Sequence, residues 1–196
     1  MKTLIIATKN KGKIREIKEL LEGTPWEIRS MGEAGIDLDI VEDGTTFEEN
    51  ALIKAKAIRK ITGGVVLADD SGLEVDFLNQ APGIYTARFL GEHAPDADRC
   101  RGLLRLLDGV PDPYRKARFV CSAAIVSEHL EMTVRGVLEG QIAWQAAGAN
   151  GFGYDPIFWV PEYGMTLAQM DSETKNRISH RGKAFRAVAE RLKQLL

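Results

Sequence analysis

Residues 3–21 read TLIIATKNKGKIREIKELL, and this stretch determines how the fold begins. Its apolar run from Thr3 to Ala7 predicts a short buried strand, and the polar residues Lys9 to Gly12 predict a loop. Apolar residues then return at the spacing of one helix face, at Ile14, Ile17, Leu20 and Leu21. The chain therefore begins with a strand, a loop and a helix.

A second helix and a second buried strand are predicted further along the chain. Thr46, with Glu49 three residues later, is a capping-box pattern that marks a helix start, and Gly63-Gly64 marks its end. Residues 65–68 then have the composition of a buried strand. We expect the acidic sequence Asp69-Asp70-Ser71-Gly72 to form a turn before extended structure resumes.

The C-terminal half predicts a hairpin followed by a glycine-rich loop. The strand-like runs 117–127 and 132–138 are separated by a few polar residues, which favours an antiparallel pair. Loop 148–155 precedes a strand at 156–160 and a C-terminal helix. Because strands and helices alternate while one pair is antiparallel, we predict an α/β fold: a long mixed β-sheet with flanking helices. Two lobes around a cleft, within one domain spanning 1–196, would suit such a sheet.

Composition excludes several classes of function. The formal net charge is −2, so no overall basic field would attract nucleic acid. Two cysteines are too few for a secreted disulfide framework, and the N-terminal apolar run is too short for a signal peptide. No apolar stretch approaches the roughly 18 residues of a membrane span. We expect a cytoplasmic protein with neither a nucleic-acid nor a membrane partner.

The loop Thr8 to Lys13 has the features of an anion site. It precedes a helix, where free backbone N–H groups and the helix dipole favour negative charge. Lys9, Lys11 and Lys13 crowd a position where acidic residues are usual, so a phosphate would neutralise them. The simpler alternative is a solvated polar loop. The spacing of a Walker A loop is absent, which disfavours an ordinary P-loop enzyme.

Asp69 and Asp70 follow an apolar strand and are candidate magnesium ligands. Mg²⁺ binds carboxylates, keeps several waters and bridges to substrate phosphates. Neighbours in an extended segment point to opposite faces, so one of the two can serve structure instead. Glu42 and Asp43 could add a carboxylate to the same ion. The alternatives are a simple Asp-Ser-Gly turn and a solvated acidic loop.

The segment 150–156 suits a purine, because Phe152 and Tyr154 could stack on a base and Asp155 could accept from ring N–H groups. Its glycines would let the backbone approach a ligand. Packing of both aromatic rings in the core is the competing interpretation. Lys175 and the segment 179–182 supply cations and a base-edge donor near a helix start, unless they form a surface turn.

Taken together, these segments resemble the inosine triphosphate pyrophosphatase family, the XTP/dITP diphosphatases. The resemblance runs end to end and rests on ATKNKGK, VEDGTTFEENALIKA, LADDSGLEVD, APGIYTARF, GFGYDPIF and KNRISHRG. It implies a two-lobed α/β homodimer with a nucleotide cleft between the lobes. It also implies magnesium-dependent hydrolysis of ITP, dITP and XTP to the monophosphate and pyrophosphate.

The resemblance also implies roles for individual residues. Asp70 would be the general base and a magnesium ligand, with Glu42 as the second carboxylate. The triphosphate would contact Thr8, Lys9, Asn10, Lys11, Gly12 and Lys13. The remaining substrate contacts would be Ser71, Phe152, Gly153, Tyr154, Asp155, Lys175, His180 and Arg181.

Three other functions compete with this one. A Maf-like nucleotide pyrophosphatase would share the basic first loop, but the GFGYDP and SHRG segments argue against it. A nucleotide sensor would not require the carboxylates Asp69 and Asp70. Nucleic-acid binding through the cluster Lys9 to Arg15 would require more than one small basic patch on an acidic chain.

Overall fold

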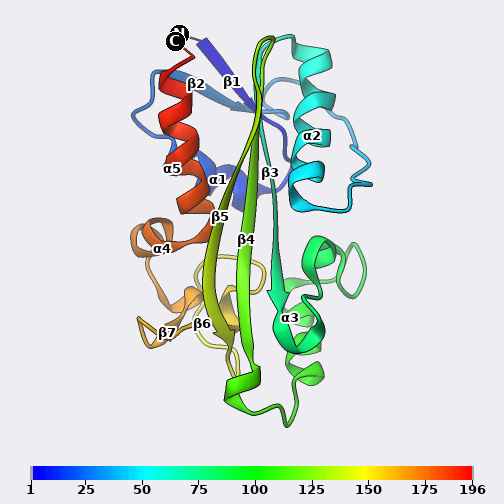
Figure 1. Cartoon of the computed structure of the whole chain (residues 1–196), viewed down its shortest axis with the longest axis vertical. Coiled ribbons are helices and arrows are strands. Elements are labelled where there is room, and N and C mark those ends of the chain that lie inside the picture. The colour runs from blue at the N-terminus through cyan, green and yellow to red at the C-terminus, as the bar shows by residue number, and fades with distance from the viewer. Residues whose placement is uncertain (1, 196) are drawn as a thin grey trace. The chain divides into compact units, whose positions relative to one another are not determined.

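The computed structural model describes residues 2–195, which form two compact units (Figure 1). Within the described residues, the first unit contains the chain up to Asp70, the segment Cys121–Gly136 and the chain from His180 onward. The second unit contains Ser71–Val120 and Val137–Ser179. The chain thus passes from the first unit into the second directly after Asp70.

The strands of the described residues form one sheet in the order β2-β1-β3-β4-β5-β6-β7. Strand β1 pairs in parallel with β2 and β3, whereas β6 pairs antiparallel with β5 and β7. This mixed sheet with flanking helices confirms the predicted α/β fold class. The strands are β1 (Lys2–Ile6), β2 (Trp26–Ser30), β3 (Val65–Val75), β4 (Lys116–Val126), β5 (Glu131–Ile142), β6 (Phe158–Val160) and β7 (Met165–Thr166).

In the first unit, helices cover both faces of the strands. The α-helices of this unit are α1 (Lys11–Leu20), α2 (Phe47–Thr62) and α5 (His180–Lys193). Leu4 and Ile6 of β1 pack in one cluster with α1 and α5, whereas Ile5 packs in another with α2. Figure 1 shows α2 and α5 on opposite sides of the strands. This alternation is the period-two pattern of a strand buried on both faces.

The predicted helix boundaries near α2 are confirmed. The Thr46 hydroxyl accepts from the Glu49 N–H at 3.1 Å, as an N-cap does, and Gly63 ends the helix with a left-handed φ of 67°. Ile61 lies in the last turn of α2 and is 57% exposed. The buried apolar face of α2 therefore ends at Ile58, about one turn before the helix does.

The predicted turn at Asp69-Asp70-Ser71-Gly72 is wrong, because β3 runs unbroken from Val65 to Val75. Two adjacent carboxylates usually favour an exposed turn, since burying an unpaired charge is costly. Asp69 and Asp70 are both buried here, but each lies beside cationic side chains. The strand can therefore continue through them.

The second unit has its own hydrophobic core, which includes Leu103, Phe158, Leu167 and the ring of Tyr154. Its α-helices are α3 (Asp96–Leu106) and α4 (Ser172–Ile178). The region before α3 contains short 3-10 helices. The 3-10 helices of the described chain are Asp76–Leu78, Gly83–Arg88, Asp112–Tyr114, Asp155–Ile157 and Leu167–Gln169. None of the helices within residues 2–195 combines the length and apolar character needed to cross a membrane.

Arg115 connects the end of α3 to the end of β5 within this unit through hydrogen bonds. Its guanidinium is buried and donates to the carbonyl oxygens of Leu107, Val110, Ile142 and Ala143. A buried cation with several hydrogen bonds is well compensated for the loss of water. Arg115 therefore has a structural role.

Gly136 of β5 allows the start of α5 to approach the sheet, and its replacement should be costly. A Cβ at Gly136 would lie 2.1 Å from the carbonyl oxygen of His180 and 2.7 Å from the Ala184 nitrogen. We expect Gly136→Ala to lower the free energy of unfolding by about 2 kcal/mol or more, because a rigid backbone must shift. Gly64→Ala is the control, since nothing lies within 4 Å of a Cβ there. Chemical denaturation of both variants checks this, and equal stabilities would contradict it.

Candidate active site

Asp69 and Asp70 point to opposite faces of β3, as expected for neighbours in a strand. Asp69, on the face of α1 and α5, has one carboxylate oxygen 3.0 Å from Lys13 Nζ and 3.5 Å from Arg181 Nε. Arg181 also forms an ion pair of 2.5 Å with Glu16 of α1. The Asp69 carboxylate thus lies beside two side chains that are predicted to contact the substrate, Lys13 and Arg181.

Asp70 lies on the opposite face and meets side chains of α2. Lys54 Nζ is 3.5 Å from Asp70 Oδ1 and 2.9 Å from Glu42 Oε2. The Asn50 side-chain amide donates to Asp70 Oδ2 at 3.2 Å and accepts from the Gly44 N–H at 2.9 Å. We call Glu42, Asn50, Lys54 and Asp70 the α2 cluster. It joins the two predicted metal carboxylates through one lysine.

Sequence reasoning missed Lys54 and Asn50, although the sequence contains a signal for them. They are four residues apart and so share one side of α2. That side is the buried one, which also carries Ala51, Ala55 and Ile58. A lysine and an asparagine within a buried apolar stripe require polar partners, which makes them candidates for a functional role.

Burial and charge together set the protonation of the α2 cluster. Burial raises the pKa of Asp70 above the ordinary carboxyl value, although the ammonium groups of Lys54 and Lys13 oppose this shift. Burial alone would lower the pKa of Lys54, but the carboxylates of Asp70, Glu42 and Asp69 outweigh it and raise that pKa. The cluster thus places one ammonium beside two carboxyl groups, which are also suitable ligands for a further cation.

The basic loop forms the N-terminus of α1. Asn10 is the N-cap, and its side-chain oxygen accepts from the Lys13 N–H at 3.0 Å. The first turn of α1 has no acidic residue that would compete for an anion. Lys9 is turned toward the acidic loop instead, with Nζ 2.7 Å from Asp37 and 2.6 Å from Asp39. Its side chain must exchange these exposed partners to reach a phosphate.

The glycine-rich loop of the second unit is organised by Asp155, which is 3% exposed. Its Oδ2 accepts from the Phe152 N–H at 2.9 Å and forms an ion pair of 2.6 Å with Lys175. Lys175 Nζ also lies 5.0 Å from the centre of the Phe152 ring. A Cβ at Gly151 would fall 2.0 Å from Asp155 Oδ2, so only glycine fits there. One buried ion pair thus orders the loop.

The two aromatic residues of this loop differ in their surroundings. The Tyr154 ring is 3% exposed within the core, and its hydroxyl donates to the Thr86 carbonyl at 2.9 Å. Burial raises the pKa of Tyr154 far above its ordinary value, so the phenol keeps its proton. The Tyr154 ring therefore packs in the core, whereas Phe152 is only partly buried.

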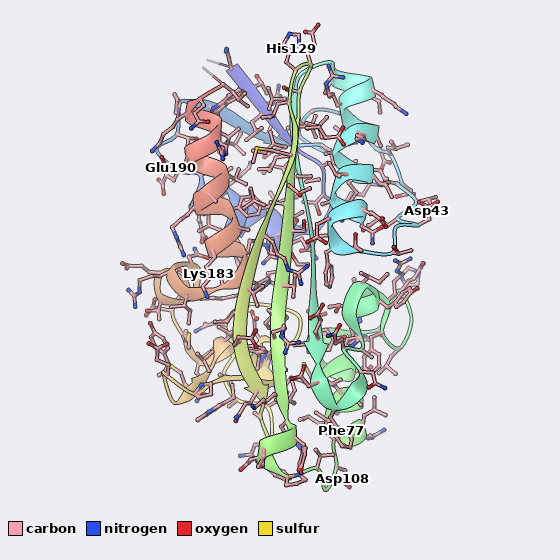
Figure 2. The ribbon with its side chains drawn as sticks, in the orientation of Figure 1. Asp43, Phe77, Asp108, His129, Lys183 and Glu190 are labelled. Atoms are coloured by element: carbon pink, nitrogen blue, oxygen red, sulfur yellow. The ribbon has the colours of Figure 1, made fainter. Side chains whose placement is uncertain are left out.

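The predicted site residues are divided between the two units. The first unit contains Thr8 to Lys13, Glu42, Asp70, His180 and Arg181, and the second contains Ser71, Phe152 to Asp155 and Lys175. Asp43 is exposed, and Figure 2 shows it on the outer side of the loop before α2, with His129 at the tip of the β4–β5 hairpin. No group of three or more histidine, cysteine, aspartate or glutamate side chains suited to a metal occurs among residues 2–195. Asp70 and Glu42 are brought together by Lys54, without a third such side chain beside them in the described part of the chain.

The fold and this site define a class of α/β proteins in which a parallel strand presents a buried carboxylate beside a basic helix N-terminus. The chain belongs to the Ham1 family, whose model matches residues 4–191.

Proteins of similar sequence and structure agree with this family assignment. The chain is 50% identical over 191 residues to a dITP/XTP pyrophosphatase of Caldanaerobacter subterraneus subsp. tengcongensis, covering 97% of this chain and 96% of that protein. It is 49% identical over 203 residues to a dITP/XTP pyrophosphatase of Clostridium perfringens, covering the whole of both chains. A solved HAM1 protein of Coxiella burnetii superposes with a TM-score of 0.90 at 41% identity, covering 99% of this chain and 100% of that one.

Proposed function

We propose that this protein hydrolyses non-canonical purine nucleoside triphosphates, such as ITP, dITP and XTP, to the nucleoside monophosphate and pyrophosphate. Such an enzyme removes these nucleotides from the cellular pool. The observation that carries the proposal is the α2 cluster, in which Asp70 and Glu42 share Lys54. Identity of about half the residues with dITP/XTP pyrophosphatases over nearly the whole chain supports the same reaction.

In the proposed mechanism, Asp70 takes a proton from the attacking water. A carboxylate whose pKa is raised by burial is a stronger base than an ordinary one. The N-terminus of α1, with Thr8 to Lys13, would hold the triphosphate and stabilise the charge that develops on the phosphates. Lys13 is kept nearby by its ion pair with Asp69. No covalent enzyme intermediate is required.

The donor set of the α2 cluster fits Mg²⁺. Asp70 and Glu42 supply the hard oxygen ligands that this ion prefers, and Mg²⁺ needs few of them because it retains waters and substrate phosphates. Their side chains already lie within 3.5 Å of one cation, the Lys54 ammonium. When bound, Mg²⁺ would neutralise phosphate charge during cleavage between the α and β phosphates.

We assign recognition of the base to the second unit, through Phe152, Gly153, Asp155, Lys175 and the backbone of Tyr154, whose ring packs in the core. A partly buried Phe152 ring suits stacking on a purine. A pocket that donates to a 6-keto oxygen would leave that donor unpaired against the amino group of adenine, at a cost of roughly 1–3 kcal/mol. ATP should then be a poor substrate. Further substrate contacts are proposed for Ser71, His180 and Arg181.

We further propose a cytoplasmic homodimer that takes a small-molecule substrate and no nucleic acid. Cys100 and Cys121 are both buried, and two cysteines are too few for a secreted disulfide framework, which supports a reducing compartment. The dimer rests on the family resemblance alone.

The deciding experiment measures pyrophosphate release from ITP, XTP, GTP and ATP, with magnesium and with a chelator. We expect magnesium-dependent pyrophosphate from ITP and XTP, with kcat/KM for ATP lower by about 100-fold or more. Release of orthophosphate in place of pyrophosphate, or no turnover of any purine triphosphate, would reject the proposed reaction.

A further inference from the structure

Helix α3 holds the peptide groups on both sides of Gly153. The Gly153 N–H donates to Asp96 Oδ2 at 2.8 Å, and the Gly153 carbonyl accepts from Cys100 Sγ at 3.4 Å. Asp96 and Cys100 are four residues apart and therefore lie on one side of α3. One turn of this helix thus contacts a single residue of the glycine-rich loop twice.

Gly153 requires such support more than its neighbours do. Its φ is +64°, in the left-handed region, and it has no side chain whose packing would select that conformation. The side chains on either side of Gly153 have different surroundings, because Tyr154 packs in the core while the Phe152 ring faces Lys175. The backbone of Gly153 therefore connects the buried Tyr154 to the partly buried Phe152.

Asp96 and Cys100 are themselves well fixed. Arg99 donates to the second oxygen of Asp96 at 3.1 Å, and its guanidinium also donates to the carbonyls of Phe89, Gly91 and Glu92. Cys100 is 4% exposed, and burial, with the nearby carboxylates of Asp96 and Asp155, raises its pKa to about 11. The thiol therefore keeps its proton and remains a donor.

We propose that Asp96 and Cys100 are positioning residues for base recognition, which fix the backbone of Gly153 and thereby the orientation of Phe152. This inference rests on the proposed function of the loop Phe152 to Asp155. Neither residue is assigned a part in the chemical step. Loss of either side chain should therefore weaken binding of the base and reduce the preference for ITP over ATP more than it slows cleavage.

The test compares Asp96→Ala with two matched variants. We expect Asp96→Ala to raise KM for ITP about tenfold, the effect of losing one hydrogen bond to a charged group, with kcat changed by less than about threefold. The preference for ITP over ATP in kcat/KM should fall as well. Asp96→Asn keeps an acceptor and should restore most of both values. Asp98→Ala removes a carboxylate that pairs with Arg101 instead, and it should behave as the unmodified protein.

Cys100 provides a second probe in case Asp96→Ala folds poorly. Cys100→Ala removes the donor with little change in volume and should raise KM for ITP by about threefold, because a thiol is a weak donor. Cys100→Ser retains a donor and should be closer to the unmodified protein. Thermal unfolding of each variant separates loss of structure from loss of recognition.

The possible outcomes separate this inference from the function on which it rests. An active unmodified protein in which Asp96→Ala matches Asp98→Ala, or loses kcat alone, would overturn the positioning role and leave the pyrophosphatase function intact. Failure of the unmodified protein to hydrolyse ITP and XTP would overturn both. A raised KM and reduced ITP preference, rescued by Asp96→Asn, would support the role.

Discussion

Asp70→Asn is expected to lower kcat for pyrophosphate release from ITP by about 1,000-fold while leaving the protein at least as stable as before. A positioned general base contributes on the order of 10²–10⁴ in rate, and an amide cannot accept the proton from water. Because Asp70 is also a proposed magnesium ligand, its replacement should in addition weaken the response to magnesium.

The stability part of this prediction follows from the sign of the pKa shift. Burial raises the pKa of Asp70, so the ionised carboxyl is less favourable in the folded protein than in the unfolded chain. The stabilising effect of the protonated form is fully present below the unfolded pKa and is lost as the pH rises through the folded pKa. Above the folded pKa the charge therefore costs stability, and a neutral asparagine removes this cost.

Pyrophosphate release and thermal unfolding at neutral pH, measured together, test both halves of the prediction. Asp43→Asn is the matched control, because Asp43 is an exposed acid in the adjacent loop. Retention of most of the activity in Asp70→Asn would exclude Asp70 as the base. A markedly less stable Asp70→Asn would show that its ion pair with Lys54 matters more than its burial.

Lys54→Met is expected to destabilise the protein by about 3 kcal/mol, since it leaves two carboxylates of the α2 cluster without their shared cation. Lys54 is 8% exposed and lies 2.9 Å from Glu42 and 3.5 Å from Asp70, so solvent screens these ion pairs little. Lys60→Met, on the exposed side of the same helix, should change stability by less than about 0.5 kcal/mol. Urea unfolding at neutral pH measures both.

Loss of the lysine should also shift the pH dependence. The Lys54 ammonium lowers the pKa of Asp70 against the larger effect of burial, so its removal raises that pKa further. The acid limb of kcat/KM should then move to higher pH, because the base is protonated over a wider range. The destabilisation should lessen as the pH falls through the raised pKa, since a protonated Asp70 no longer needs a cation.

The double variant Lys54→Met with Asp70→Asn isolates the interaction between the two side chains. It should recover a large part of the stability lost in Lys54→Met, because only Glu42 then lacks its cation. A double variant as unstable as Lys54→Met would mean that the lysine acts through packing rather than charge.

The sequence predicted the first unit well because local rules coincide there with tertiary structure. The apolar run of β1, the capping residue Thr46 and the stop at Gly63 each depend on nearby residues, and the structure confirms all three. The course of β3 through Asp69 and Asp70 could not be predicted in this way. It depends on Lys13, Lys54 and Arg181, which lie far along the chain.

The same distinction between local and distant signals applies to the residues of the candidate site. Asp70, Lys13 and the glycine-rich loop could be identified from motifs, whereas the signal for Lys54 and Asn50 is only their position within the apolar stripe of α2. Asp96 and Cys100 are more remote still, since they contact Gly153 from a helix more than fifty residues earlier in the chain. Motifs indicate which residues meet a substrate, but not which residues hold them in place.

The alternation of Asp69 and Asp70 along β3 also limits the changes in chain length that this strand can accept. Inserting or deleting one residue between Val65 and Asp69 would move every later side chain of β3 to the opposite face of the sheet. The proposed base would then face Lys13 and Arg181, and its neighbour would face Lys54. Over generations, point substitutions should therefore accumulate in this segment far more readily than single-residue insertions or deletions.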